Sequence, residues 1–382
     1  MRKEKLFATS LIAMGLALGG CSSKPDAESS AGVEGTQQKS VQESKSKQAT
    51  PQTTKQSSPT STLVEEETVV RYDSYTEYPD AQLFIQEMME EGFSAQYLTS
   101  VLSEAKRQES ILKAISRPAE GRLTWGKYRK IFIEPKRISQ GVKFWQENKT
   151  VLERAEQVYG VPPEIIVAII GVETRYGRIT GSYRVLDALA TLGFDYPRRS
   201  KFFRGQLKEY LRLVKEEQVG VTSLKGSYAG AMGYGQFIPS SYRNYAVDFD
   251  QDGKRDIWNN KTDAIGSVAN YFAVHGWKTG EPVISAVSLP AALEEDWFGK
   301  GRKGLIPKVT IGEWQERGVK SNLGLAPEGK ATLLRLEIEE DLQYWLGLHN
   351  FYVITRYNHS NLYAMAVYRL SEEIKRAYST AQ

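Results

Sequence analysis

The sequence is poor in the residues that cross-link a fold or bind transition metals. One cysteine, Cys21, and three histidines occur among 382 residues. Disulfide frameworks, cysteine zinc sites and thiol catalysis are therefore excluded, because Cys21 lies outside any segment expected to fold. The histidines His275, His349 and His359 match no metal-ligand spacing. We expect no cofactor for catalysis.

Clusters of lysine and arginine are also lacking. The formal net charge is +4, from 50 basic and 46 acidic residues, and the excess is spread along the chain. This pattern argues against nucleic acid as a partner, since nucleic-acid-binding surfaces concentrate their positive charge. Hydrophobic residues make up 41% and charged residues 25%, as in ordinary globular proteins. A mildly basic globular protein remains suited to an anionic polymer.

Long hydrophobic runs are limited to residues 6–20, which follow a short basic start. This run is too short for a membrane span and is typical of a signal peptide, which we assign to 1–20. It ends in Leu-Gly-Gly before Cys21 and resembles the lipobox of bacterial lipoproteins. That resemblance implies cleavage before Cys21 and acylation of Cys21, and Ser22 resembles the outer-membrane sorting pattern. An ordinary signal peptide with an incidental cysteine is the alternative.

Residues 21–70 lack the apolar side chains that a core requires. They are mainly Ser, Thr, Gln, Lys, Glu and Pro, without one aromatic residue. Such a segment cannot bury enough apolar surface to fold, so we expect a lipidated disordered tether. Together with the lipobox, it predicts an outer membrane lipoprotein facing the periplasm of a Gram-negative bacterium.

Residues 71–382 are expected to form one predominantly helical α+β region. Apolar residues recur at three- and four-residue spacing over 80–102, 137–159 and the closing segment 362–378. Residues 162–173 are apolar on every side after two prolines, which indicates a buried core helix. Between about 281 and 357 the runs 308–311, 331–338 and 351–356 alternate apolar with polar residues, which predicts a small antiparallel sheet.

Glu173 is the candidate catalytic residue, because it ends this buried helix. Removal from water and the negative end of a helix both raise a carboxyl pKa, which favours a protonated acid near neutral pH. A general acid that donates to a glycosidic oxygen needs this property. The alternative is a structural glutamate paired with Arg175 or Arg178.

Six motifs resemble the membrane-bound lytic murein transglycosylase B family, glycoside hydrolase family 103. They are GVETRYGR at 171–178, VLDALATL at 185–192, FDYPRR at 194–199, GSYAGAMGYGQFIPSSY at 226–242, DAIGSVANYF at 263–272 and TRYNHS at 355–360. The resemblance implies a lysozyme-like fold with a groove for peptidoglycan glycan strands. It also implies non-hydrolytic cleavage of the MurNAc–GlcNAc bond to 1,6-anhydro-MurNAc ends.

Carried over residue by residue, the resemblance makes Glu173 the acid and then the base. It implies these substrate-binding residues: Ser227, Gln236, Tyr271, Tyr357, Asn358, Tyr128, Arg198 and Arg199. The tyrosines would stack on sugars, and the two arginines would meet peptide carboxylates. Without the resemblance, tyrosines at helical spacing indicate core positions and an Arg-Arg pair indicates a solvated surface.

A calcium site is indicated by the segment DFDQDGK at 248–254, which has the order of ligands in an EF-hand loop. Asp248, Asp250 and Asp252 supply carboxylates, Gly253 the turn, and Lys254 a backbone carbonyl. The twelfth position is Asn259 instead of Glu. In the family, a lengthened loop is closed by the aspartate that corresponds to Asp263. The loop 248–263 is thus expected to hold a structural Ca²⁺, with an ion-free Asp/Gly turn as the alternative.

Two other functions remain open from the sequence. A hydrolytic muramidase needs a second carboxylate about 5–9 Å from the first, and Asp187 and Asp195 are the nearest in the sequence. In the family, neither position is catalytic. A peptidoglycan-binding lipoprotein without activity is the other alternative, which the presence of Glu173 disfavours.

Overall fold

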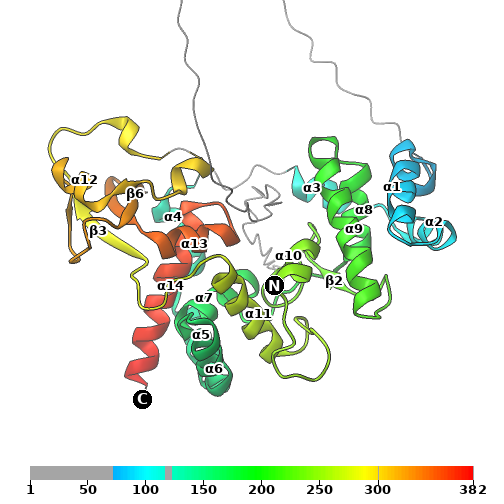
Figure 1. The fold of residues 1–382 in the computed structure, drawn as a ribbon, viewed down its shortest axis with the longest axis horizontal. Coiled ribbons are helices and arrows are strands. Elements are labelled where there is room, and N and C mark those ends of the chain that lie inside the picture. Colours follow the sequence, from blue (N-terminus) through cyan, green and yellow to red (C-terminus); the bar gives the residue numbers. More distant parts are fainter. Residues whose placement is uncertain (1–71, 117–122, 300, 382) are drawn as a thin grey trace, which may run out of the picture. The chain divides into compact units, whose positions relative to one another are not determined.

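The computed structural model describes residues 72–116, 123–299 and 301–381. The predicted signal peptide, Cys21 and the tether lie outside these residues. The described part is mostly helical with a small proportion of antiparallel sheet (Figure 1), as the sequence predicts. Its α-helices are α1 (Pro79–Glu90), α2 (Ala95–Glu104), α3 (Glu109–Ile115), α4 (Trp125–Phe132), α5 (Pro135–Glu147), α6 (Lys149–Tyr159), α7 (Pro163–Thr174), α8 (Val185–Phe194), α9 (Ser200–Glu216), α10 (Pro239–Tyr245), α11 (Lys261–Val274), α12 (Ile311–Glu316), α13 (His349–Tyr357) and α14 (Asn361–Thr380).

The strands form two antiparallel sheets. The larger has the order β4-β6-β7-β3-β5, and its longest pairing places Leu333 opposite Leu346. Its strands are β3 (Ile284–Ser288), β4 (Val309–Thr310), β5 (Lys320–Ser321), β6 (Lys330–Ile338) and β7 (Asp341–Gly347). The smaller pairs β1 (Tyr183–Arg184) with β2 (Lys225–Gly226). Four 3₁₀ helices complete the described elements: η1 (Tyr75–Glu77), η2 (Pro197–Arg199), η3 (Glu295–Trp297) and η4 (Arg302–Leu305).

Helix α7 is the centre of the first hydrophobic core. All twelve of its residues are buried, as expected for a segment that is apolar all round. Pro163 occupies its first turn, where the missing N–H costs nothing. Helices α5, α6, α11 and α14 pack around it, and Figure 1 shows the red α14 beside α5.

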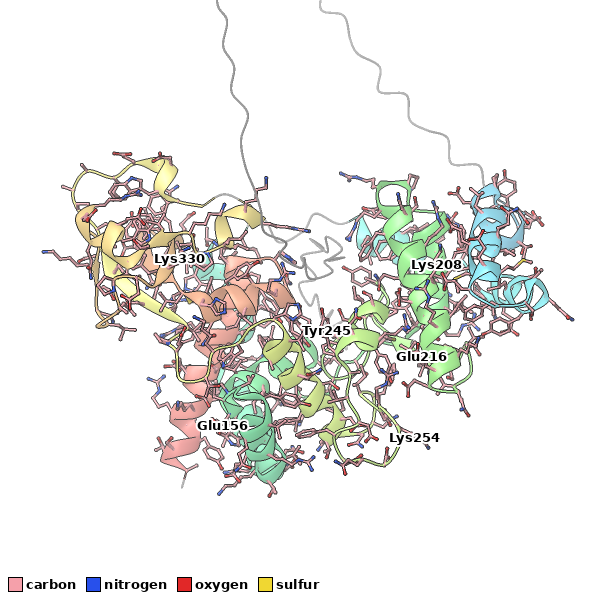
Figure 2. All side chains as sticks on the ribbon, viewed as in Figure 1. Glu156, Lys208, Glu216, Tyr245, Lys254 and Lys330 are labelled. Atoms are coloured by element: carbon pink, nitrogen blue, oxygen red, sulfur yellow. The ribbon has the colours of Figure 1, made fainter. Side chains whose placement is uncertain are left out.

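A second core joins α1, α2, α8, α9 and α10, and a third lies under the larger sheet around Trp314 and Leu333. Ion pairs on the surface support the second core: Lys208 on α9 contacts Glu87 on α1, and Arg243 on α10 contacts Glu216 on α9. Figure 2 labels Lys208 and Glu216. Tyr357 packs against both the first and the second core.

One predicted strand is wrong, whereas the helical interpretation of 80–102 and 137–159 is confirmed. Residues 351–356 belong to helix α13 and are not a strand, because their apolar side chains Phe351, Val353 and Ile354 enter the first core from a helix. Residues 80–102 form two helices, interrupted at Gly92, whose φ is +84°. Residues 137–159 likewise form two helices that meet at Asn148.

In the part of the chain that the structure describes, no single helix is both long and apolar enough to cross a membrane. Helices α6 and α7 meet the length and composition criteria only as a pair bent by 113°.

Candidate active site

Glu173 is buried at the end of α7, with 6% of its surface exposed. The Tyr363 hydroxyl, from α14, donates a hydrogen bond of 2.5 Å to Glu173 Oε1. Burial raises the pKa of Glu173 to about 7, and the Tyr363 hydrogen bond opposes this rise. A carboxyl group with this pKa can donate a proton and take one back near neutral pH.

The ion-pair alternative for Glu173 does not hold. The Arg175 guanidinium contacts Glu134, and among the described residues no ion pair involves Glu173. Arg175 instead ends the helix with its backbone: its N–H donates to the Gly171 carbonyl, and its φ of +52° turns the chain so that the Tyr176 N–H reaches the Ile170 carbonyl. Glu173 therefore has a hydroxyl partner and no cationic partner, which explains why burial dominates its pKa.

The chain after Glu173 is held in a tight, left-handed turn. Tyr176 has φ of +61° and Gly177 has φ of +82°. A Cβ on Gly177 would lie 2.0 Å from the Tyr234 ring, so only glycine fits there. The Thr174 hydroxyl donates to the Tyr234 carbonyl at 2.9 Å, which ties the end of α7 to the segment 226–242. The fold thereby brings this motif beside Glu173.

Segment 226–242 carries Ser227 and Gln236. Ser227 Oγ accepts hydrogen bonds from the N–H groups of Ala229 and Ala231, so the loop folds around this hydroxyl. Gln236 has φ of +52°, and its amide donates to the carbonyls of Thr180 and Gly233 at 3.1 Å each. Both predicted substrate-binding residues are thus fixed in place by backbone contacts.

Tyr357 and Tyr271 form an aromatic cluster next to Glu173. Their ring centroids are 4.7 Å apart, and burial raises the pKa of Tyr357, with a further rise from the negative charge of Glu173. The Tyr357 hydroxyl donates to the Gly235 carbonyl at 2.6 Å, and the Tyr271 hydroxyl donates to the Arg356 carbonyl at 2.6 Å. Asn358 directly follows, at the end of α13.

Two of the tyrosines predicted to stack on sugars expose little of their rings. Tyr128 is 1% exposed and Tyr271 is 6% exposed, while Tyr357 is half-buried. Burial is the main cause of the raised pKa of Tyr363, and Tyr128 adds a smaller electrostatic effect, which places the two rings near each other. As the structure stands, Tyr128 and Tyr271 support the residues around Glu173 rather than present a ring face.

The two predicted arginines differ in their surroundings. Arg198 is exposed in η2, whereas the Arg199 guanidinium lies 4.4 Å from the centroid of the Phe202 ring. Burial lowers the pKa of Arg199, and Arg302 adds to this effect. Burial likewise lowers the pKa of His359 to about 4, again with a contribution from Arg302. Arg302 therefore connects η2 electrostatically with the end of α13.

Sequence reasoning missed Tyr363 and Arg302. Tyr363 lies in the predicted closing helix, three residues after Ser360, which caps that helix. No pattern in the sequence indicates that its hydroxyl reaches a glutamate 190 positions earlier. Arg302 has no motif around it, and its proximity to Arg199 arises only from the tertiary structure.

The two candidate second carboxylates are engaged elsewhere. Asp187 accepts hydrogen bonds from the Arg184 guanidinium and the Lys106 N–H. Asp195 accepts from the hydroxyls of Tyr75 and Tyr78. These contacts hold the N-terminal segment against α8, so both carboxylates have structural roles.

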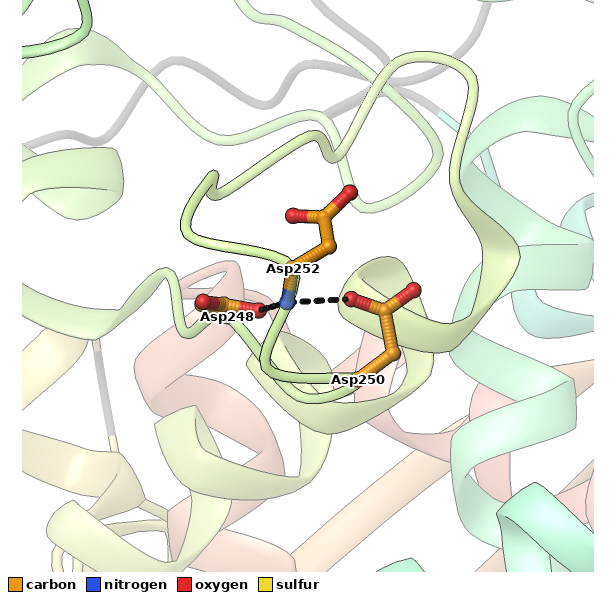
Figure 3. Close-up of side chains that lie close together, drawn as sticks. All are labelled: Asp248, Asp250 and Asp252. Atoms are coloured by element: carbon orange, nitrogen blue, oxygen red, sulfur yellow. Dashed lines mark hydrogen bonds between the residues drawn. The ribbon is translucent and has the colours of Figure 1, made fainter.

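The acidic loop brings three aspartates together (Figure 3). One carboxylate oxygen of each of Asp248, Asp250 and Asp252 lies within 4.8 Å of the others. The Asp252 N–H donates to Asp248 and Asp250, and the Lys254 N–H donates to Asp252 Oδ1. Exposed carboxylates this close repel one another, so the donor set fits a hard divalent cation such as Ca²⁺.

Asp263 has a different environment from these three. It is fully buried, and its two oxygens accept the N–H groups of Phe249 and Asp256 at 2.7 and 2.8 Å. Asp263 therefore closes the loop 248–263 through hydrogen bonds to its backbone. Its expected role as a direct metal ligand remains a prediction.

A buried carboxyl group with a pKa of about 7, at the end of a core helix in a mostly helical α+β fold, has the property that a general acid for cleavage of a glycosidic bond needs. The family model for the transglycosylase SLT domain matches residues 76–372. The chain is 47% identical over 311 residues to membrane-bound lytic murein transglycosylase B of Escherichia coli (strain K12). The match covers 78% of this chain and 82% of the relative.

Solved structures agree with this match. The soluble lytic transglycosylase SltB1 of Pseudomonas aeruginosa is 53% identical, with a TM-score of 0.74, over 78% of this chain and 99% of that one. The Escherichia coli lytic transglycosylase Slt35, solved in complex with calcium, is 46% identical, with a TM-score of 0.73. The match covers 82% of this chain and 98% of that one. The chain belongs to this transglycosylase family. It is a lytic transglycosylase that acts on the murein, or peptidoglycan, of the cell wall.

Proposed function

We propose that Glu173 alone carries out both proton transfers of a non-hydrolytic cleavage of the β-1,4 MurNAc–GlcNAc bond. The observation that carries this proposal is the environment of Glu173, a buried carboxyl with a pKa of about 7. Among the described residues, no second carboxylate contributes to this pKa. A lone acid with a pKa close to neutral can act first as an acid and then as a base.

In the first step, Glu173 gives its proton to the glycosidic oxygen as the bond to C1 of MurNAc breaks. The oxygen of the MurNAc acetamido group attacks C1 and forms an oxazolinium ion. In the second step, the Glu173 carboxylate removes the proton of the C6 hydroxyl, and O6 attacks C1. The oxazolinium ring opens, a 1,6-anhydro ring closes, and Glu173 is again protonated without consumption of water.

The predicted substrate-binding residues divide into two groups in this reaction. Ser227 and Asn358 orient the acetamido group, while Gln236, Tyr271, Tyr357 and Tyr128 shape the site around Glu173. Arg198 and Arg199 bind the carboxylates of the peptide attached to MurNAc. The cation–π contact between Arg199 and Phe202 supports this assignment, because it holds the guanidinium in a defined position.

Hydrolysis is the less favoured reaction. It would need a second carboxylate to activate water or to attack C1. Asp187 and Asp195 are occupied by Arg184, Tyr75 and Tyr78, so neither carboxylate is available for that role.

Replacing the proton-transfer group tests the assignment of Glu173. Glu173→Gln keeps the size of the side chain but cannot exchange a proton, so turnover of purified peptidoglycan should fall at least about 100-fold. A variant that retains activity would refute this role.

The same variant reports on the burial of the carboxyl. Because burial raises the pKa of Glu173 from 4.5 to about 7, its stabilising contribution is present below pH 4.5 and is lost as the pH rises through 7. Above pH 7, the free energy of unfolding of Glu173→Gln should therefore exceed that of the wild type by up to about 3 kcal/mol. Chemical denaturation at pH 5 and pH 8 measures this difference and shows that the inactive variant is folded.

We further propose that the loop 248–263 binds Ca²⁺ as a structural ion. Asp248, Asp250 and Asp252 would supply carboxylate ligands, Lys254 its carbonyl oxygen, and Asp263 the closing contact. The ion would stabilise the loop and take no part in bond cleavage. The calcium complex of Slt35 supports this proposal.

For localisation, we propose that Cys21 is the lipid attachment site and anchors the enzyme to the outer membrane, facing the periplasm. The membrane-bound relative from Escherichia coli supports an anchored form. Mass spectrometry of the mature chain should find acyl groups on Cys21 in the outer-membrane fraction. A soluble periplasmic chain without acyl mass would contradict the proposal.

A further inference from the structure

A cavity of about 460 Å³ lies between α4, β7 and α14. Its walls include the indoles of Trp125 and Trp345 and three basic side chains, Arg129, Lys130 and Arg369. Its volume is within the range of small-ligand sites, and its walls belong to packed helices and a strand instead of loops.

This cavity is separate from the surroundings of Glu173. Successive residues of a helix are rotated by about 100°, so Met365, Arg369 and Glu373 share a face of α14 that differs from the face of Tyr363. Tyr363 contacts Glu173, whereas the other three line the cavity. None of the charged residues that line the cavity affects the pKa of Glu173.

The positive charge of the cavity is incompletely compensated. Its one carboxylate, Glu373, contacts Arg376 outside the cavity and lies 4.0 Å from Arg369. Lys130 lies 3.4 Å from Glu339, but both side chains are mostly exposed. Within the described ranges, Arg129 has no ion-pair partner. Three cations thus face a cavity in which one carboxylate is already shared.

The polar groups on these walls are mainly hydrogen-bond donors. Arginine, lysine and the indole N–H donate and do not accept. The indole nitrogen of Trp345 is buried and has no hydrogen-bond partner among the described residues. A buried donor without an acceptor costs about 1–3 kcal/mol, so its presence calls for a missing acceptor. The cavity therefore suits an anionic ligand that is rich in acceptor oxygens and can pack against indole rings.

We propose that this cavity is an accessory site for the carboxylates of a peptidoglycan peptide stem, distinct from the stem at the cleaved bond. The proposal rests on peptidoglycan being the substrate and is independent of the reaction assigned to Glu173. In peptidoglycan the free carboxylates belong to the peptides, and the guanidinium group matches a carboxylate with two parallel hydrogen bonds. A membrane surface would instead require an exposed basic patch, not cations lining a ligand-sized cavity. The accessory site would hold a neighbouring part of the cross-linked wall during cleavage.

Calorimetric titration of the full chain with a soluble disaccharide-tetrapeptide tests the proposal. The chain carries Glu173→Gln in all samples, so no turnover occurs. We expect two binding events, of which one weakens at least about 10-fold when Arg129→Gln and Arg369→Gln are added, because two charge-assisted contacts are lost. The same event should be lost when the carboxylates of the probe are amidated. Lys143→Gln with Lys149→Gln removes two surface cations elsewhere and serves as the control.

Two further measurements distinguish loss of the site from unfolding of the variant, and a peptide ligand from a membrane. Lys130→Gln changes a side chain that is 67% exposed and should not affect folding, so a weaker second event in this variant supports the site even if the double variant unfolds. Vesicles of phosphatidylglycerol test the competing ligand. The proposal would be overturned by a single binding event, or by two events that persist in the double variant. It would also be overturned if the double variant lost vesicle binding but bound the disaccharide-tetrapeptide unchanged.

Discussion

At the scale of single residues, the proposed proton transfers involve Glu173 and its contact with Tyr363. The Tyr363 hydroxyl donates to Oε1, so we expect the exchangeable proton of the carboxyl group on Oε2. Tyr363 is itself 1% exposed, so its hydroxyl has little freedom to move away. We infer that Tyr363 is a positioning residue that fixes the orientation of the Glu173 carboxyl.

Removal of this hydroxyl should change the pH profile of the enzyme. The hydrogen bond lowers the pKa of Glu173 against the effect of burial, so Tyr363→Phe should raise that pKa. Because the first step needs the protonated acid, the alkaline limb of kcat/KM should move up by about one pH unit, which corresponds to about 1.4 kcal/mol. Turnover at the wild-type optimum should fall roughly 10-fold, since the carboxyl loses its fixed orientation.

Tyr368→Phe is the matched control, because Tyr368 lies on the same helix but makes no contact with Glu173 in the described structure. Its pH profile should equal that of the wild type. An unshifted alkaline limb in Tyr363→Phe would show that the hydroxyl has only a packing role.

At the scale of elements, the sequence predicted the features that depend on local pattern. Helix α7 and the closing helix α14 follow from apolar spacing and from prolines, and β6 follows from alternation. The position of Glu173 at the end of α7 was also predictable, because Tyr176 and Gly177 follow a continuous apolar run.

The features that the sequence could not predict depend on tertiary contacts. Residues 351–356 alternate like a strand but form α13, because the first core accepts their apolar residues from a helix. The low exposure of Tyr128 and Tyr271 is set by packing of α4 and α11, which spacing alone cannot reveal. The pairing of Tyr363 with Glu173 joins two helices that are distant in the sequence.

The acidic loop allows a prediction about stability. Millimolar Ca²⁺ should raise the melting temperature by about 5 °C, because a ligand at 100 times its Kd stabilises the folded state by about 2.7 kcal/mol. Asp248→Asn with Asp252→Asn should abolish this gain, since two of the three clustered carboxylates are removed. Asp341→Asn, at an exposed aspartate in β7, should preserve it. Equal melting curves of the wild type in Ca²⁺ and in chelator would exclude a calcium site.

At the scale of the whole molecule, the two helical cores meet next to Glu173. Helix α7 of the first core supplies Glu173, while Tyr271 packs in the second core and Tyr357 contacts both. The end of α7 is tied to segment 226–242 through Thr174. Assembly of the site therefore requires both helical cores, because neither core alone contains all of its residues.

Cleavage of the glycan strand by one glutamate without water leaves a signature in the products of digestion. Purified peptidoglycan sacculi are digested in oxygen-18 water, and the released fragments are analysed by mass spectrometry. We expect 1,6-anhydro-MurNAc ends, no reducing termini and no oxygen-18 in the products. Reducing ends that carry oxygen-18 as the main product would refute the proposed reaction, because they require water to attack the anomeric carbon.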